Sequence, residues 1–123
     1  MRFDVVTLFP EMFSALTQWG VTGRACEQSL VSVHLWNPRD FCSDSRKTVD
    51  DRAYGGGPGM VMMAEPLAAC VEAIRAERGQ DRLTAPLVFF SPIGTTLQNT
   101  AVQKWADSAG AVLLCGQIGR AHV

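Results

Sequence analysis

The sequence predicts an α/β fold in which a mostly parallel sheet is flanked by helices. Short β-rich runs alternate along the chain with amphipathic helical patterns, an order typical of such layered proteins. Two of the runs, Leu87–Phe90 and Ala111–Cys115, are apolar throughout, as expected of parallel strands that are covered on both faces. With 123 residues, 47% of them hydrophobic and 19% charged, the chain fits one globular domain.

The first two elements are a strand and a helix. Phe3–Phe9 is rich in β-branched and aromatic residues, and Glu11–Trp19 then follows a helical pattern. Within that pattern Met12, Leu16 and Trp19 fall at i, i+4 and i+7, which is one face of a helix. We therefore expect these three side chains to form the apolar stripe of the first helix.

A second helix and a second strand come next. Gly20 is expected to end the first helix, and Thr22 to cap a short helix that runs through Gln28. Val31–Trp36 alternates apolar and polar residues as a half-buried strand does. His34 lies opposite the apolar face of that strand, so we expect it at the surface.

A long loop and a long helix occupy the middle of the chain. The segment Arg39–Gly59 is predicted to be a loop, and a loop of that length in a small domain is usually functional. The helix that follows opens at Glu65 and ends near Gly79. Its apolar stripe is formed by Leu67, Val71 and Ile74.

Two loops follow the two apolar strands and point to a binding crevice. Ser91–Thr96 leads to a helix at Asn99–Ser108, and the other loop begins at Gly116. Ligands of open parallel sheets bind beyond the carboxyl ends of the strands, and the small residues of these loops allow close approach to the backbone. Ordinary strand-to-helix turns use the same residues, so the pattern by itself leaves both interpretations open.

The segment Arg46–Met60 has the most unusual composition. Its fifteen residues include two adjacent carboxylates, three cations and four glycines, which indicates a binding loop. A carboxylate at Asp50 can accept hydrogen bonds from the N1–H and the exocyclic amine of a guanine. It can equally pair with Arg52 or cap the glycine-rich turn, and the sequence does not decide between these roles.

Composition excludes several function classes. The net charge of −1 gives no global basic surface, and the glycine-rich segment lacks the Lys-Ser/Thr of a phosphate loop. Neither a signal peptide nor a membrane-spanning run is expected. No metal site is expected, because the cysteines form no CxxC pair; we expect reduced, mostly buried thiols in a cytoplasmic protein, at positions Cys26, Cys42, Cys70 and Cys115.

Six sequence motifs resemble those of one protein family. VTLFPEMF, VTGRA, PRDF, RKTVDDRAYGGGPGMVMM, SPIG and LLCG resemble, in order and spacing, the bacterial tRNA (guanine-N1)-methyltransferases over Met1–Gly116. That resemblance implies a SPOUT-type α/β knot fold, S-adenosyl-L-methionine as cofactor, and a homodimer. It also implies tRNA as substrate, methylated at N1 of the guanosine immediately 3′ of the anticodon.

The resemblance assigns roles to the two groups of loops. It places the family's aspartate general base in the C-terminal half of the domain, beyond this chain, so no catalytic residue is assigned. Phe89 stands where many members carry tyrosine, and Ile93 where they often carry glutamine. The implied cofactor-binding residues are Phe89, Phe90, Ser91, Pro92, Gly94 and Gly116. The implied substrate-binding residues are Asp50, Arg52, Gly55, Gly56, Gly57 and Gly59.

The last seven residues depart from the family pattern. Gln117–Val123 reads QIGRAHV and can be back-translated into a common sequencing-adapter string, so we interpret residues 117–123 as a non-native tail. Residues 1–116 are then the N-terminal part of the methyltransferase domain, truncated before the knot is complete. We expect this fragment to be inactive, because half of the cofactor pocket is missing. The alternative function is a non-catalytic RNA-binding module on the same scaffold.

Overall fold

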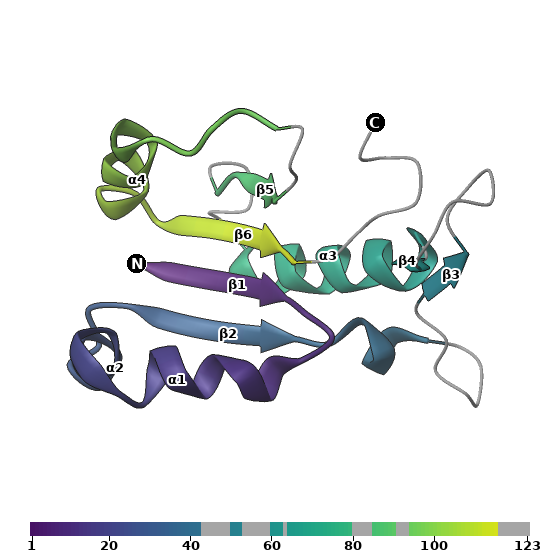
Figure 1. Cartoon of the computed structure of the whole chain (residues 1–123), viewed down its shortest axis with the longest axis horizontal. Coiled ribbons are helices and arrows are strands. Elements are labelled where there is room, and N and C mark those ends of the chain that lie inside the picture. Colours follow the sequence, from purple (N-terminus) through teal and green to yellow (C-terminus); the bar gives the residue numbers. More distant parts are fainter. Residues whose placement is uncertain (43–49, 53–59, 63, 80–84, 91–93, 116–123) are drawn as a thin grey trace.

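The N-terminal strand β1 (Arg2–Val6) is one of the two inner strands of a four-stranded sheet. The computed structural model describes residues 1–42, 50–52, 60–62, 64–79, 85–90 and 94–115. The strand order is β2-β1-β6-β5, and every neighbouring pair is parallel, which confirms the predicted sheet (Figure 1). The other three strands are β2 (Ser32–Trp36), β5 (Leu87–Phe89) and β6 (Gly110–Leu114).

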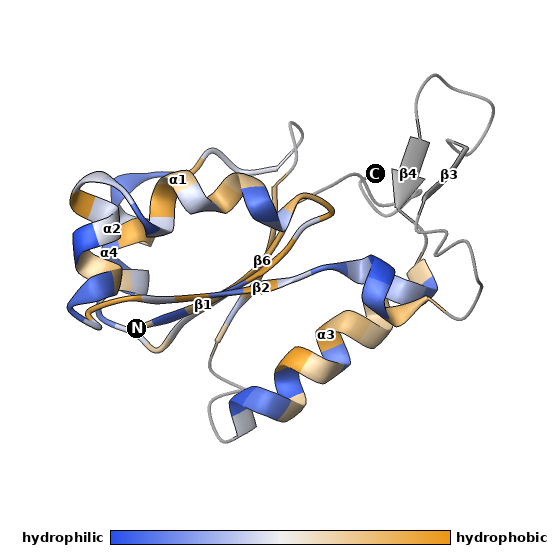
Figure 2. Ribbon diagram, turned by 90° about the horizontal axis from the view of Figure 1, so that it is seen from below, coloured by the Kyte–Doolittle hydropathy of each residue, from blue (hydrophilic) through white to orange (hydrophobic). Residues whose placement is uncertain are grey.

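Helices cover both faces of this sheet (Figure 2). The long helix α3 (Ala64–Arg78) lies on one face. The other face carries η1 (Pro10–Phe13), α1 (Ser14–Thr17), α2 (Gly20–Glu27) and α4 (Asn99–Ala106). The predicted order of strands and helices is therefore confirmed, and the molecule has three layers.

The main core lies between α3 and the two inner strands. The helix contributes the predicted stripe, in which Leu67 and Ile74 are buried and Val71 is half-buried. Burial of such side chains stabilises the fold by roughly 1.5–3 kcal/mol each. The buried cluster consists of Val6, Leu67, Cys70, Ile74, Val112 and Leu114.

The first helical segment differs from the prediction. It divides into the short helices η1 and α1 and ends at Thr17, while Gly20, with φ +68°, begins α2 instead of ending the helix before it. The predicted stripe of Met12, Leu16 and Trp19 is not buried, since these side chains are 70%, 51% and 70% exposed. The periodicity indicates helix correctly at Met12 and Leu16, whereas Trp19 lies between α1 and α2.

The strand assignments differ in two places. The first strand ends at Val6 and not at Phe9, because the Thr7 hydroxyl accepts a hydrogen bond from the Phe9 backbone N–H and turns the chain. The run at Leu87–Phe90 forms the edge strand β5, so Leu87 and Phe90 remain 45% and 47% exposed. An entirely apolar run of residues therefore did not mean that the strand is covered on both faces.

The predicted long loop, Arg39–Gly59, contains most of a 3₁₀ helix and one short strand, and a second short strand follows it directly. The 3₁₀ helix η2 (Pro38–Phe41) is capped by Asn37, whose Oδ1 accepts a hydrogen bond from the Arg39 backbone N–H at 3.0 Å. Further on, β3 (Asp50–Arg52) pairs antiparallel with β4 (Met60–Met62). The loop prediction is wrong at residues 39–41 and 50–52, whereas residues 43–49 and 53–59 lie outside the described part of the chain.

Candidate functional site at the carboxyl end of the sheet

All four strands of the main sheet end side by side (Figure 1). Backbone hydrogen bonds continue just past the strand ends: Thr7 donates to Trp36 at 2.9 Å, and Cys115 donates to Val6 at 3.0 Å. Phe90 likewise donates to Leu114 at 3.5 Å. The segments that follow β5 and β6 thus begin as neighbours, which is the arrangement from which open α/β sheets build ligand sites.

A pocket of about 730 Å³ opens between the end of β5 and helix α4. Three of the predicted cofactor-binding residues, Phe89, Phe90 and Gly94, meet in its wall. Ser91, Pro92 and Gly116 lie outside the described residues, so the structure does not place them. The remaining lining residues are Val88, Thr95, Thr96, Leu97, Ala101 and Trp105.

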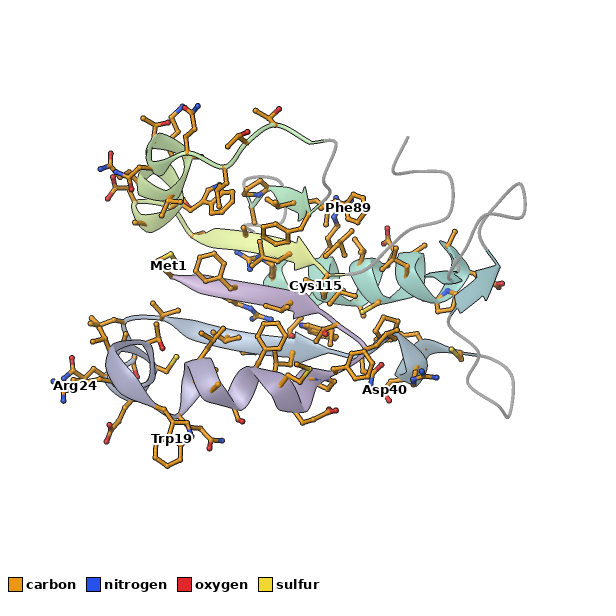
Figure 3. The ribbon with its side chains drawn as sticks, in the orientation of Figure 1. Met1, Trp19, Arg24, Asp40, Phe89 and Cys115 are labelled. Carbon is orange, nitrogen blue, oxygen red and sulfur yellow. The ribbon has the colours of Figure 1, made fainter. Side chains whose placement is uncertain are left out.

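The α4 side of this pocket was missed by sequence reasoning. Ala101 and Trp105 are four residues apart in α4 and both line the cavity, because residues at i and i+4 share a helix face. That spacing was visible in the sequence, but nothing in it indicated that this face would meet β5. Figure 3 shows Phe89 on the neighbouring strand, at the same end of the sheet as Cys115.

The pocket suits a flat heteroaromatic ring that carries a sugar. Its wall is mostly aromatic and aliphatic, and two adjacent hydroxyls are supplied by Thr95 and Thr96. Cys115, at the end of β6, does not add a nucleophile, because burial raises the pKa of its thiol and keeps it protonated. The described part of the site is therefore built for binding.

The predicted substrate-side residues are placed only in part. Asp50 and Arg52 lie in β3, where Asp50 is paired with Met62 and Arg52 with Met60. The glycines Gly55, Gly56, Gly57 and Gly59 are outside the described residues. The strand β4 ends directly before α3, and α3 packs against η2, which follows the carboxyl end of β2. Connectivity thus brings this ribbon to the same end of the sheet, while its side-chain roles stay predictions.

A second cluster of ionisable groups lies away from this site. Asp4, His34 and Glu77 bring one possible ligand atom each to within 4.8 Å of one another. His34, which was expected at the surface, is half-buried on the edge strand β2. The Asp4 carboxylate accepts hydrogen bonds from Arg2, Arg78 and Trp36, so its negative charge is already compensated by protein cations.

The fold defines a class, an open parallel α/β protein, and ligands of this class bind at the carboxyl ends of the strands. A family model described as tRNA (Guanine-1)-methyltransferase TrmD matches residues 1–119. The chain belongs to this family. Relatives named tRNA (guanine-N(1)-)-methyltransferase from Polynucleobacter asymbioticus and Polaromonas sp. are 59% and 58% identical to it over 118 residues.

Solved structures agree with this assignment. A crystal structure of tRNA (m1G37) methyltransferase from Aquifex aeolicus matches with a TM-score of 0.82 and 26% identity. The match covers 99% of this chain and 55% of that one, which confirms the predicted SPOUT-type architecture for the part present. The chain spans about half the length of the curated relatives it matches, 48% and 46% of the two named above. None of the described helices is long and apolar enough to cross a membrane.

Proposed function

We propose that this chain is the N-terminal half of an enzyme that methylates N1 of guanosine in tRNA, at the position immediately 3′ of the anticodon. One observation carries the proposal: in a member of this family, β5 and β6 are neighbours whose following segments leave the same end of the sheet. Both predicted cofactor segments therefore follow strands that end at the same end of the sheet. The chain spans half of its relatives, so the activity is proposed for the complete domain.

S-adenosyl-L-methionine is the proposed cofactor, and it supplies a methyl group on a positively charged sulfur. Phe89, Phe90 and Gly94 would hold its adenosine part, since they line a pocket of suitable lining and size. Ser91, Pro92 and Gly116 are assigned to the same role by resemblance. The absence of a side chain at Gly94 would let the ligand approach the backbone closely.

On the substrate side, Asp50 and Arg52 are proposed to contact the target guanosine. Guanine N1 carries a proton, so a carboxylate that accepts this N–H and the exocyclic amine distinguishes guanine from adenine. Removal of that proton by a general base is typically worth about 10² to 10⁴ in rate. The resemblance places this base beyond the present chain. Gly55, Gly56, Gly57 and Gly59 would form the turn that the nucleotide approaches.

The complete protein is further proposed to be a knotted cytoplasmic homodimer. The exposed apolar side chains of Met12, Leu16 and Trp19 support association with another protein surface. All four cysteines are free thiols, although only Cys70 is fully buried, and this supports a reducing compartment. We propose that residues 117–123 do not belong to the native sequence.

A chimera tests the proposed function. Residues 1–116 of this chain would be joined to the C-terminal half of the Polynucleobacter asymbioticus relative, which is 59% identical over the matched segment. Transfer of a radiolabelled methyl group from S-adenosyl-L-methionine to a tRNA transcript is then measured. We expect transfer to a transcript with guanosine 3′ of the anticodon, and none when adenosine replaces it.

Two controls make the result decisive. Asp50→Asn in the chimera should reduce transfer while leaving cofactor affinity unchanged, because Asp50 is assigned to the substrate side. The intact relative, assayed in parallel, shows that the tRNA is a competent substrate. A folded chimera that binds tRNA without cofactor and transfers no methyl group would contradict the proposal and favour a non-catalytic RNA-binding module.

A further inference from the structure

A buried carboxylate in the middle of β1 joins three elements, away from the candidate site. The Asp4 side chain in β1 is fully buried. Its Oδ1 accepts hydrogen bonds from the Arg2 guanidinium at 2.9 Å and from the Trp36 indole in β2 at 2.9 Å. Its Oδ2 pairs with the guanidinium of Arg78 at the end of α3, which is also fully buried.

Arg78 extends this network to a fourth segment. Its guanidinium also donates to the backbone carbonyls of Arg2 and Ala109, each at 3.2 Å, and Ala109 directly precedes β6. Arg78 is the last residue of α3, where a cation is favoured by the helix dipole. Among the described residues no buried side-chain nitrogen or oxygen lacks a hydrogen-bond partner, so the network is complete.

Such a network restricts the relative position of the elements that it joins more than it adds to the free energy of unfolding. Replacing a buried ion pair by apolar residues of similar volume is often neutral or stabilising, so the pair does not account for the free energy of folding. The apolar stripe of α3 is non-directional and allows small shifts and rotations of the helix. A charge held by several hydrogen bonds of fixed geometry allows one position only.

We propose that Asp4 and Arg78 form a lock that fixes the position of α3 on the sheet. The helix has 15 residues and is therefore about 22 Å long. At its other end it follows β4 after a single residue, so the lock also fixes where the β3–β4 ribbon sits relative to the carboxyl end of the sheet. This inference holds whether or not the complete protein transfers methyl groups.

The test uses a double variant of the 123-residue chain, Asp4→Asn with Arg78→Met. Asparagine keeps an acceptor for the Trp36 indole, and methionine fills the volume of the arginine stem without its charge. We expect the backbone amides of α3 to exchange with deuterium at least about tenfold faster, while those of β1 and β6 change less than about twofold. The matched control is Glu77→Gln, the residue of α3 before Arg78, whose side chain is 51% exposed and accepts a hydrogen bond from the Arg2 guanidinium at 2.7 Å.

A second measurement distinguishes a change in the position of α3 from a loss of global stability. Labelling with 5-fluorotryptophan gives one fluorine resonance for each tryptophan, assigned for Trp36 with Trp36→Phe. Trp36 touches both Asp4 and the core beneath α3, so its resonance should split or broaden in the double variant and stay single in the control. The single variant Arg78→Lys keeps the positive charge at position 78 but not the fork of donors. The α3 amides of this variant should exchange more slowly than those of the double variant and faster than those of the parent chain.

Two results would overturn the lock. One is unchanged α3 exchange with a single Trp36 resonance in the double variant. The other is equal loss of protection in α3, β1 and β6, because the ion pair would then serve global stability and not the placement of one helix.

Discussion

At the scale of single residues, Gly110 shows how backbone contact dictates residue type. It opens β6 with φ +112°, and a Cβ atom built there would overlap the carbonyl oxygen of Arg2 on β1. We predict that Gly110→Ala lowers the free energy of unfolding by about 3 kcal/mol, through strain and a forced separation of the two inner strands. Urea denaturation followed by circular dichroism measures this change.

Gly20 supplies the matched control for that substitution. It also has a positive φ, of +68°, but a Cβ atom there meets nothing within 4 Å. Gly20→Ala should therefore cost only about 1 kcal/mol, the conformational term alone. Equal losses in the two variants would show that backbone conformation, and not contact with Arg2, governs Gly110.

Asp4 makes the stability of the molecule depend on pH in a defined direction. Burial alone would raise the pKa of this carboxyl, but the hydrogen bonds from Arg2, Arg78 and Trp36 outweigh it and hold the pKa below its ordinary value of 3.8. A carboxyl with a depressed pKa in the folded state stabilises the fold above its unfolded-state pKa. That contribution is lost as the pH falls below 3.8 and through the folded-state value.

We predict the consequence for Asp4→Asn. At neutral pH the variant should be less stable by about 3–5 kcal/mol, because Arg78 is left buried without its anion. The difference between parent and variant should shrink as the pH falls below about 4, since the parent loses its own contribution there. Urea unfolding across this pH range checks it. Glu77 and His34 also face Asp4, so Glu77→Gln in the same series isolates the Asp4 contribution.

At the scale of elements, the sequence predicted which segments form strands and helices better than it predicted whether those elements are buried or exposed. Strands, helices and their order followed from periodicity, because the alternation of side chains is a local property. Whether a strand is inner or at an edge depends on pairing partners distant in the sequence. The apolar runs of β5 and β6 are therefore alike in sequence, although only β6 is buried between two neighbours.

Helix α4 offers a test of the pocket at this scale. Ala101 lines the pocket, whereas its neighbour Val102 does not and is 42% exposed. We predict that Ala101→Phe fills the cavity and weakens binding of S-adenosyl-L-methionine to the chimera by at least about tenfold, a loss of about 1.4 kcal/mol. Val102→Phe places the same aromatic side chain at a position that does not line the pocket, and it should leave the affinity unchanged. Isothermal titration calorimetry of both variants decides whether this pocket holds the cofactor.

At the scale of the whole molecule, the site was predictable as a location but not as a set of contacts. Parallel strands with small residues after two of them implied a crevice at their carboxyl ends. The α4 wall, with Trp105, required knowledge that residues of α4 and β5 would line the same pocket, which no local pattern carries. The acidic and glycine-rich segment identified the family by its composition, yet only Asp50 and Arg52 among its predicted contacts lie in the described part.

The last prediction concerns the exposed apolar surface at η1 and α1. Met12, Leu16 and Trp19 were expected to share one helix face, and all are at least 51% exposed; Figure 3 shows Trp19 directed away from the body of the molecule. Exposed apolar groups of this size drive association in water. We predict that the 123-residue chain self-associates as its concentration rises, and that Leu16→Ser with Trp19→Ser reduces this association. Because neither side chain is buried, the free energy of unfolding should change by less than about 0.5 kcal/mol for each substitution. Sedimentation velocity over a range of concentrations measures association, and urea unfolding measures stability. A variant that associates as strongly as the parent, or that unfolds far more easily, would show that this face is not the one through which copies meet.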